Sequence, residues 1–131
     1  MSFLTRQGGD WPQAGKSLLP CPRKSNCVCS LDTRPVYAIA PFSFEGDPER
    51  ALEKLDHLLS SLPRTRIVDR RPAYLRAECV SFLFRFIDDV EFLLDREKSV
   101  IEVRSASRAG FSDFGVNRKR VESWREMFLK K

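Results

Sequence analysis

Apolar residues recur at helical spacing in two segments of the chain. In residues 46–63, Asp47 can cap a helix that starts at Pro48, and Pro63 ends it. The apolar stripe of this segment consists of Ala51, Leu52, Leu55, Leu58, Leu59 and Leu62. In residues 116–131, Val121, Trp124 and Phe128 repeat at the same spacing, with Met127 alongside. The pattern predicts two amphipathic helices.

Between these helices the apolar positions no longer follow the helical repeat. They recur at every second residue, which is typical of a strand. Apolar and polar residues alternate over 73–86, 88–95 and 99–107, and a shorter strand is expected at 64–70. The segments 88–95 and 99–107 are joined by a short polar turn, which predicts a hairpin. A further strand, interrupted by a proline, is expected at 36–44. On one face of these strands the alternation places Leu75, Ala77, Cys79, Val90, Phe92, Leu94, Ile101 and Val103.

The order of the predicted elements is strand, helix, four strands, helix. Two amphipathic helices need an apolar sheet face to bury their stripes, so we expect an α+β fold. Its sheet is antiparallel, has about five strands and carries both helices on one face. Helix-grip and TATA-binding-protein-like folds share this order, which is an analogy of fold and not of function.

Residues 1–34 are rich in Gly, Pro, Ser and Asn and show no period. We expect them to form an irregular N-terminal arm, with residues 35–131 as a single α+β domain.

Composition narrows the class of protein further. The chain has 131 residues, a formal charge of +5 and no apolar run long enough for a membrane span or signal peptide. We therefore expect a soluble, cytoplasmic protein. A solvated basic surface explains the charge most simply, and an acidic partner is the alternative. Nucleic acid is not expected, because the alternation assigns the aromatic residues to the core: Phe82, Phe84, Phe86 and Phe92.

The chain contains four cysteines, and three of them lie close together. The spacing of Cys21, Cys27 and Cys29 matches no zinc ribbon or finger, so neither a metal nor another cofactor is expected. A disulfide between Cys21 and Cys27 is geometrically easy in an oxidising compartment, but the expected cytoplasmic location favours free thiols. Cys79 is expected to pack in the sheet.

Three motifs carry a resemblance to a known family. They are "CPRKSNCVCS" near the start, "FLFRFIDDVEFLL" in the middle and "VRSASRAGFSDFGVNRKRVE" near the end. Together they resemble domain-of-unknown-function family 1499, from about Cys21 to the C-terminus. Cys29 departs from the family pattern, in which a serine is usual. The resemblance implies a single domain and no particular reaction.

The last motif raises a question of charge. Arg118, Lys119 and Arg120 fall in the first turns of the final helix, where basic residues oppose the helix dipole. A negative group is therefore expected near them, and it can be internal or external.

The internal source would be Asp88 and Asp89, paired with arginines of the neighbouring strand, with Asp113 as a cap. The external source would be a bound phosphate, sulfate or carboxylate. The ligand-binding residues would then be Arg104, Ser105, Ser107, Arg108, Asn117, Arg118 and Arg120.

These observations favour a non-enzymatic binding or structural module that holds a small anionic ligand or a lipid head group. Two alternatives remain open. One is a hydrolase-like enzyme that uses Asp88 or Asp89, although no acid–base pair is required by the spacing. The other is an interaction module that docks on a protein partner through its N-terminal arm.

Overall fold

The computed structural model describes residues 17–80, 86–110 and 115–130. The elements of this part of the chain are, in order, β1 (Cys27–Cys29), β2 (Phe42–Ser43), α2 (Pro48–Ser61), β3 (Thr65–Arg71), β4 (Tyr74–Val80), β5 (Ile87–Asp95), β6 (Val100–Ser107) and α3 (Val116–Leu129). Neither described helix is both long enough and apolar enough to cross a membrane.

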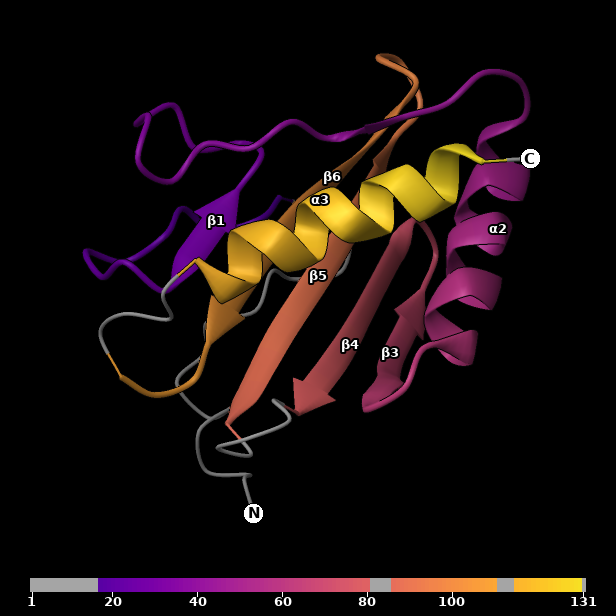
Figure 1. The fold of residues 1–131 in the computed structure, drawn as a ribbon. Coiled ribbons are helices and arrows are strands. Elements are labelled where there is room, and N and C mark those ends of the chain that lie inside the picture. The colour runs from indigo at the N-terminus through magenta and orange to yellow at the C-terminus, as the bar shows by residue number, and fades with distance from the viewer. Residues whose placement is uncertain (1–16, 81–85, 111–114, 131) are drawn as a thin grey trace.

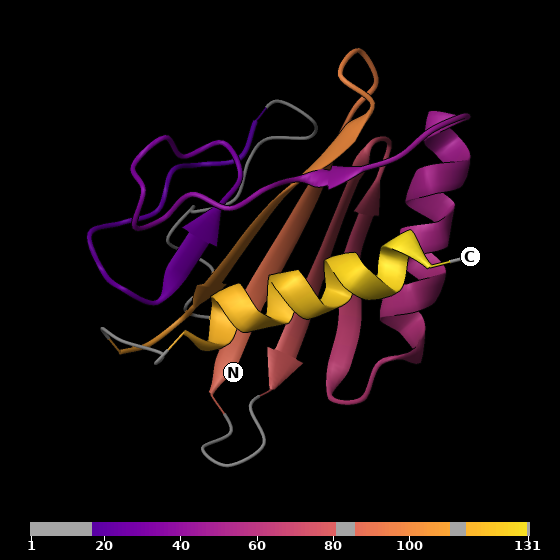
Figure 2. The same ribbon diagram turned by 45° about the horizontal axis from the view of Figure 1, so that its top comes forward.

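The strands form one antiparallel sheet in the order β1-β6-β5-β4-β3, and β2 also pairs with β6. Helix α3 crosses one face of the sheet diagonally, and α2 lies beside β3 (Figures 1 and 2). Both helices contribute to the same apolar core, so the predicted α+β fold with two helices on one face is confirmed. The likeness to helix-grip folds stays a prediction.

Helix α2 begins and ends where the sequence indicates. Asp47 is its N-cap and accepts a hydrogen bond from the Glu49 N–H at 3.4 Å, while Pro48 occupies the first helical position. Leu62 closes the helix, directly before Pro63. The buried members of the stripe are Ala51, Leu55 and Leu59.

The core confirms the predicted alternation of the strands. Leu75, Cys79, Val90, Phe92, Leu94, Ile101 and Val103 all face the helices and pack against Val121, Trp124 and Phe128. The phenylalanines differ among themselves. Phe92 is fully buried, Phe86 is 51% exposed and so is not a core residue, and Phe82 and Phe84 lie outside the described residues.

The strand expected at 36–44 is mostly absent. Only Phe42 and Ser43 form a strand, and Ala38 makes a single bridge to Cys29. The N–H groups of Tyr37 and Ala38 instead donate to the Arg34 carbonyl, which makes a turn. Pro41 has no N–H to donate to a sheet, so the segment 36–41 runs beside the sheet rather than in it.

The sheet has one more strand than the sequence suggested. Residues 27–29, which were placed in the irregular arm, form β1 and pair with Arg104, Ser105 and Ala106 of β6. The described part of that arm, residues 17–34, is therefore built into the fold.

Candidate functional site

A polar cluster lies between the sheet and the first turns of α3. We call it the helix-side cluster, and its members are Asn26, Asp88, Ser105, Ser107, Asn117 and Arg120. Asn117 is at its centre and is fully buried. The Asn117 Oδ1 accepts hydrogen bonds from Ser105 Oγ at 2.5 Å and from Arg120 Nη1 at 2.8 Å. Its Nδ2 donates to the Asn26 carbonyl at 3.1 Å and to Ser107 Oγ at 3.0 Å.

Asp88 provides a negative group near the basic residues in the first turns of α3. Its Oδ2 lies 2.8 Å from Arg120 Nη2, and Asp88 is only 2% exposed. The other oxygen, Oδ1, is buried and accepts no hydrogen bond from any described residue. Among the described residues, Arg120 is the cation that pairs with this buried carboxyl group, and removing one partner of a buried ion pair is strongly destabilising.

The same cluster holds β1 and the loop after β6. Asn26, which is 2% exposed, donates from Nδ2 to the Gly110 carbonyl at 2.6 Å, and its own carbonyl accepts the Ser107 N–H at 3.0 Å. Gly110 has φ +84, a conformation that side chains disfavour. The cluster thus joins three segments that are far apart in the sequence.

Two other arginines of α3 hold the segment 36–41. Arg118 donates to the carbonyls of Ala38 and Val36 at 2.9 and 3.1 Å, and Arg125 donates to the carbonyls of Ala40 and Pro41. These guanidinium groups satisfy carbonyls that a regular strand would have paired with a neighbouring strand. The carbonyls are neutral, so they do not compensate the charge of Arg118.

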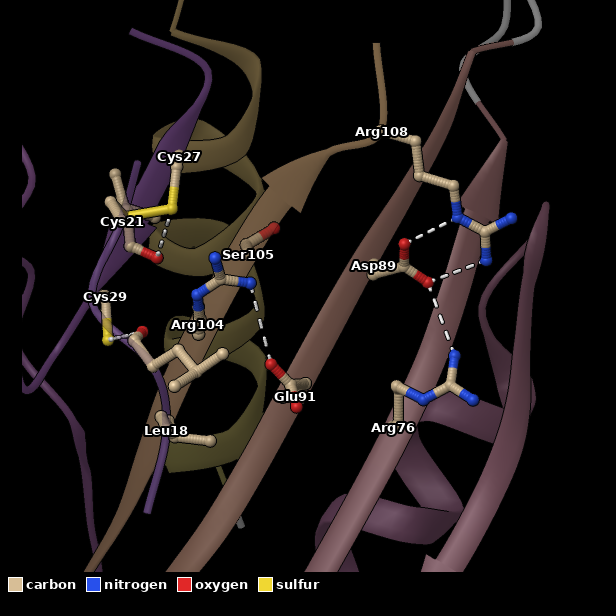
Figure 3. Close-up of polar contacts among 12 residues, drawn as sticks. Leu18, Cys21, Cys27, Cys29, Arg76, Asp89, Glu91, Arg104, Ser105 and Arg108 are labelled. Atoms are coloured by element: carbon tan, nitrogen blue, oxygen red, sulfur yellow. Dashed lines mark hydrogen bonds and ion pairs between the residues drawn. A yellow bond between two sulfur atoms is a disulfide. The ribbon is translucent and has the colours of Figure 1, made fainter. Parts of the chain in front are cut away.

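The opposite side of the sheet carries a second polar cluster, drawn with α3 behind the sheet (Figure 3). We call it the charged face, and it consists of Arg76, Glu78, Asp89, Glu91, Arg104 and Arg108. Arg76, Glu91 and Arg104 are direct cross-strand neighbours on β4, β5 and β6. Three acids and three arginines make up the set, so its formal charges balance.

Arg108 makes the tightest contacts of the charged face. Its Nε and Nη2 donate to the two oxygens of Asp89 at 2.6 and 2.9 Å, and Nη2 also donates to Glu78 at 2.5 Å. The hydrogen bonds to Asp89 raise the pKa of Arg108 above its ordinary value, so the guanidinium stays charged.

Glu91 is fully buried and is held from two sides. It accepts a hydrogen bond from the Tyr74 hydroxyl at 2.6 Å, and its Oε1 lies 3.7 Å from Arg104 Nη1. Burial, together with the charge of Glu91, raises the pKa of Tyr74 well above its usual range, so the hydroxyl keeps its proton.

Next to the charged face lies a small apolar cluster that contains a disulfide. Cys21 and Cys27 are joined with an S–S distance of 2.05 Å, where the sequence favoured free thiols. They pack with Leu18, Cys29, Tyr37, Tyr74 and Leu93. Burial raises the pKa of the Cys29 thiol, which disfavours the reactive thiolate. Within the described residues no three His, Cys, Asp or Glu side chains come together as a group that could hold a metal ion.

Asp32 holds the disulfide-bearing segment from the side. Its carboxylate accepts hydrogen bonds from the Cys21 N–H at 3.1 Å and from Arg34 Nε at 2.9 Å and Nη2 at 2.6 Å. The hydrogen bonds from Arg34 lower the pKa of Asp32 well below its usual range. Asp32 therefore stabilises the folded state most when it is ionised.

Because of Asp32, the stability of this segment is expected to depend on pH and to fall in acid. Because the folded-state pKa of Asp32 is depressed, its contribution is complete above the pKa of the unfolded chain, about 3.9, and is lost as the pH falls toward the folded-state pKa. We expect Asp32→Asn to lower the urea midpoint at pH 7 and to narrow the difference between pH 7 and pH 3. Equal differences between these pH values in both proteins would contradict this role for Asp32.

The predicted ligand-binding residues do not form one site in the structure. They lie in three different regions. Ser105, Ser107, Asn117 and Arg120 meet in the helix-side cluster, together with Asp88. By contrast, Arg104, Arg108 and Asp89 lie in the charged face. Arg118 points to the segment 36–41, and Asp113 lies outside the described residues.

Sequence reasoning missed several members of these clusters. Asn26 occurs in the first motif but is not among the predicted site residues, and Glu91 is considered only as an acid of the hydrolase-like alternative. Charged residues two positions apart on the same face of β4, β5 and β6, such as Asp89 and Glu91, were the available signal for the charged face. No sequence pattern indicated that the side chains of the charged face would be buried.

Comparison with known families gives one match. The profile of DUF1499, described as a protein of unknown function, matches residues 17–128. The chain belongs to the DUF1499 family. Neither curated proteins nor solved structures give a match. The DUF1499 match begins before β1, in agreement with a fold that includes residues 17–34.

Proposed function

We propose that this DUF1499 domain is a non-enzymatic binding module for a small anionic ligand, and that its two polar clusters hold the fold together. The ligand would be a phosphate- or carboxylate-bearing molecule or a lipid head group. The observation that carries the non-enzymatic, structural part of the proposal is the pairing of the buried acids. Asp88 and Asp89 are 2% and 3% exposed, and each is bound by an arginine.

This pairing argues against the hydrolase-like alternative. A general acid or base must come within hydrogen-bond distance of a substrate proton. Asp88 and Asp89 are too buried for such contact, and their oxygens are occupied by ion pairs with Arg120 and Arg108.

The charges of the polar clusters also bear on where an anion would bind. Asp88 compensates Arg120, and the three acids of the charged face compensate its three arginines. These two clusters therefore contribute nothing to the net charge of +5, so an anionic ligand is expected to be attracted to basic residues outside them.

The interaction-module alternative is less well supported for residues 17–34. This segment contains β1, the disulfide and Asn26, all of which contact the sheet or α3. An arm that docks elsewhere would have to give up these contacts.

A thermal-shift screen tests the proposal. Sulfate, phosphate, nucleotides, acyl phosphates and alkyl carboxylates are compared with chloride at matched ionic strength. A ligand present at a hundred times its Kd is expected to add about 2.7 kcal/mol of stability, or roughly 8 °C in Tm. If no anion raises Tm more than chloride does, the anion-binding proposal is wrong. Arg118→Gln, run in parallel, reports whether the start of α3 contributes to binding.

A further inference from the structure

A hollow lies at the end of the molecule remote from the helix-side cluster. The residues that line it come from the C-terminal end of α3, the start of α2 with the segment before it, and the β5–β6 turn. We call it the α2–α3 groove, and its volume is about 810 Å³. This size falls within the range of small-molecule sites, roughly 300–1,000 Å³.

The groove has an apolar wall. Phe44, Phe128 and Leu129 contribute to its lining, and Leu129 is 56% exposed. Phe44 and Phe128 both belong to or pack against the main core, so this wall rests on rigid structure. An alkyl chain lying on it would be removed from water.

The groove also carries three cations. Arg50, Lys54 and Lys98 line it, and none of them forms a salt bridge within the described part of the chain. Lys54 Nζ lies 5.0 Å from the centre of the Phe128 ring, which holds the ammonium next to the apolar wall.

Two acids at the groove reduce this charge without cancelling it. Glu45 and Asp47 also contribute to the lining, and the Asp47 carboxylate caps α2. Three cations against two acids leave an excess of one positive charge. An apolar wall beside a net positive rim is complementary to a molecule with an alkyl chain and an anionic head.

We propose that the α2–α3 groove binds a single-chain anionic amphiphile, of the chemical class of the fatty carboxylates. The alkyl chain lies against the exposed Leu129 and the half-buried Phe44, and the head group is held by Arg50, Lys54 and Lys98. This rests on the proposed function, and it adds the position of the site and the chemistry of the ligand.

Calorimetric titration of the full chain tests the groove directly. Octanoate, decanoate and dodecanoate are titrated below their micellar concentrations, with acetate and dodecyltrimethylammonium as head-group and charge controls. Each pair of added methylenes is expected to strengthen binding up to about tenfold. Acetate and the cationic amphiphile are expected to bind at least tenfold more weakly than dodecanoate.

Matched variants locate the binding. Arg50→Gln/Lys54→Gln/Lys98→Gln and, separately, Leu129→Asp are each expected to weaken dodecanoate binding about tenfold or more. The controls are Lys119→Gln and Val36→Asp, which alter exposed residues outside the groove and should stay within about twofold. All four are surface changes, and Tm measurements verify that each variant is folded.

The outcomes separate the two proposals. If dodecanoate fails to bind, or if the groove variants bind it as well as the controls do, the groove proposal is wrong. Anion binding as such would still stand if the thermal-shift screen had found a stabilising anion. If that screen finds none, both proposals fall.

Discussion

Replacing Arg120 by alanine is expected to lower the free energy of unfolding by about 3 kcal/mol, which corresponds to a fall in Tm of roughly 10 °C. The cause is the carboxylate of Asp88, which is 2% exposed and has its Oδ2 at 2.8 Å from the Arg120 guanidinium. Without Arg120 this buried charge loses its cation, and Asn117 Oδ1 loses one of its two donors. Urea denaturation followed by circular dichroism measures the loss.

The neighbouring lysine provides a matched control. Lys119→Ala removes one positive charge from the same helix turn, but Lys119 is exposed, so we expect a change within about 0.5 kcal/mol. If Arg120→Ala and Lys119→Ala have the same small effect, the Asp88–Arg120 pair does not act as a clamp that holds α3 to the sheet.

Removing the disulfide is expected to have the second largest effect. Cys21 and Cys27 close a loop with a sequence separation of 6, so the chain-entropy estimate for Cys21→Ala/Cys27→Ala is a loss of about 2 kcal/mol. The loss should appear first in β1, because Cys27 is its first residue and β1, a strand of three residues, is held mainly by its pairing with β6. Amide hydrogen exchange of β1 and the urea midpoint measure the two effects.

The reductant response distinguishes a lost disulfide from a lost packing contact. A thiol reductant should lower the Tm of the natural protein toward that of the double variant and leave the variant unchanged. An unchanged Tm in both the reduced protein and the variant would show that the disulfide does not stabilise the fold. Disulfides persist in oxidising compartments, so the same experiment bears on the predicted cytoplasmic location, which stays a prediction.

The helices and the central strands of this fold could be predicted from local sequence. Helix α2 has its cap, its proline and its stop within one segment, and the β5–β6 hairpin pairs two strands that are adjacent in the chain, without a break in register. Such elements are specified by residues close together in the chain.

Strand β1 could not be predicted in this way. It has only three residues and lies in a segment rich in Pro, Ser and Asn. Its position depends on pairing with β6 and on the contacts of Asn26 with residues 109, 110 and 117. The residues that make these contacts are far apart in the sequence, and no local sequence pattern predicts the contacts.

The candidate site was only partly predictable for a different reason. Arg104 and Ser105 are adjacent in β6, so they must point to opposite faces of the sheet and cannot line one pocket. The period of two already contained this information. What it did not contain is the burial of the polar face, where Glu91 and Arg104 are 0% and 3% exposed, because alternating antiparallel strands usually leave that face in water.

The most direct test of the clamp is a double-mutant cycle between Asp88 and Arg120. Urea denaturation of the natural protein, Asp88→Ala, Arg120→Ala and the double variant gives the coupling free energy of the two side chains. We expect a coupling of about 2 kcal/mol, with the double variant more stable than Arg120→Ala alone because no buried charge is left without a cation. Additive effects within about 0.5 kcal/mol would contradict it, and would show that the polar cluster under α3 does not hold the helix to the sheet through this pair.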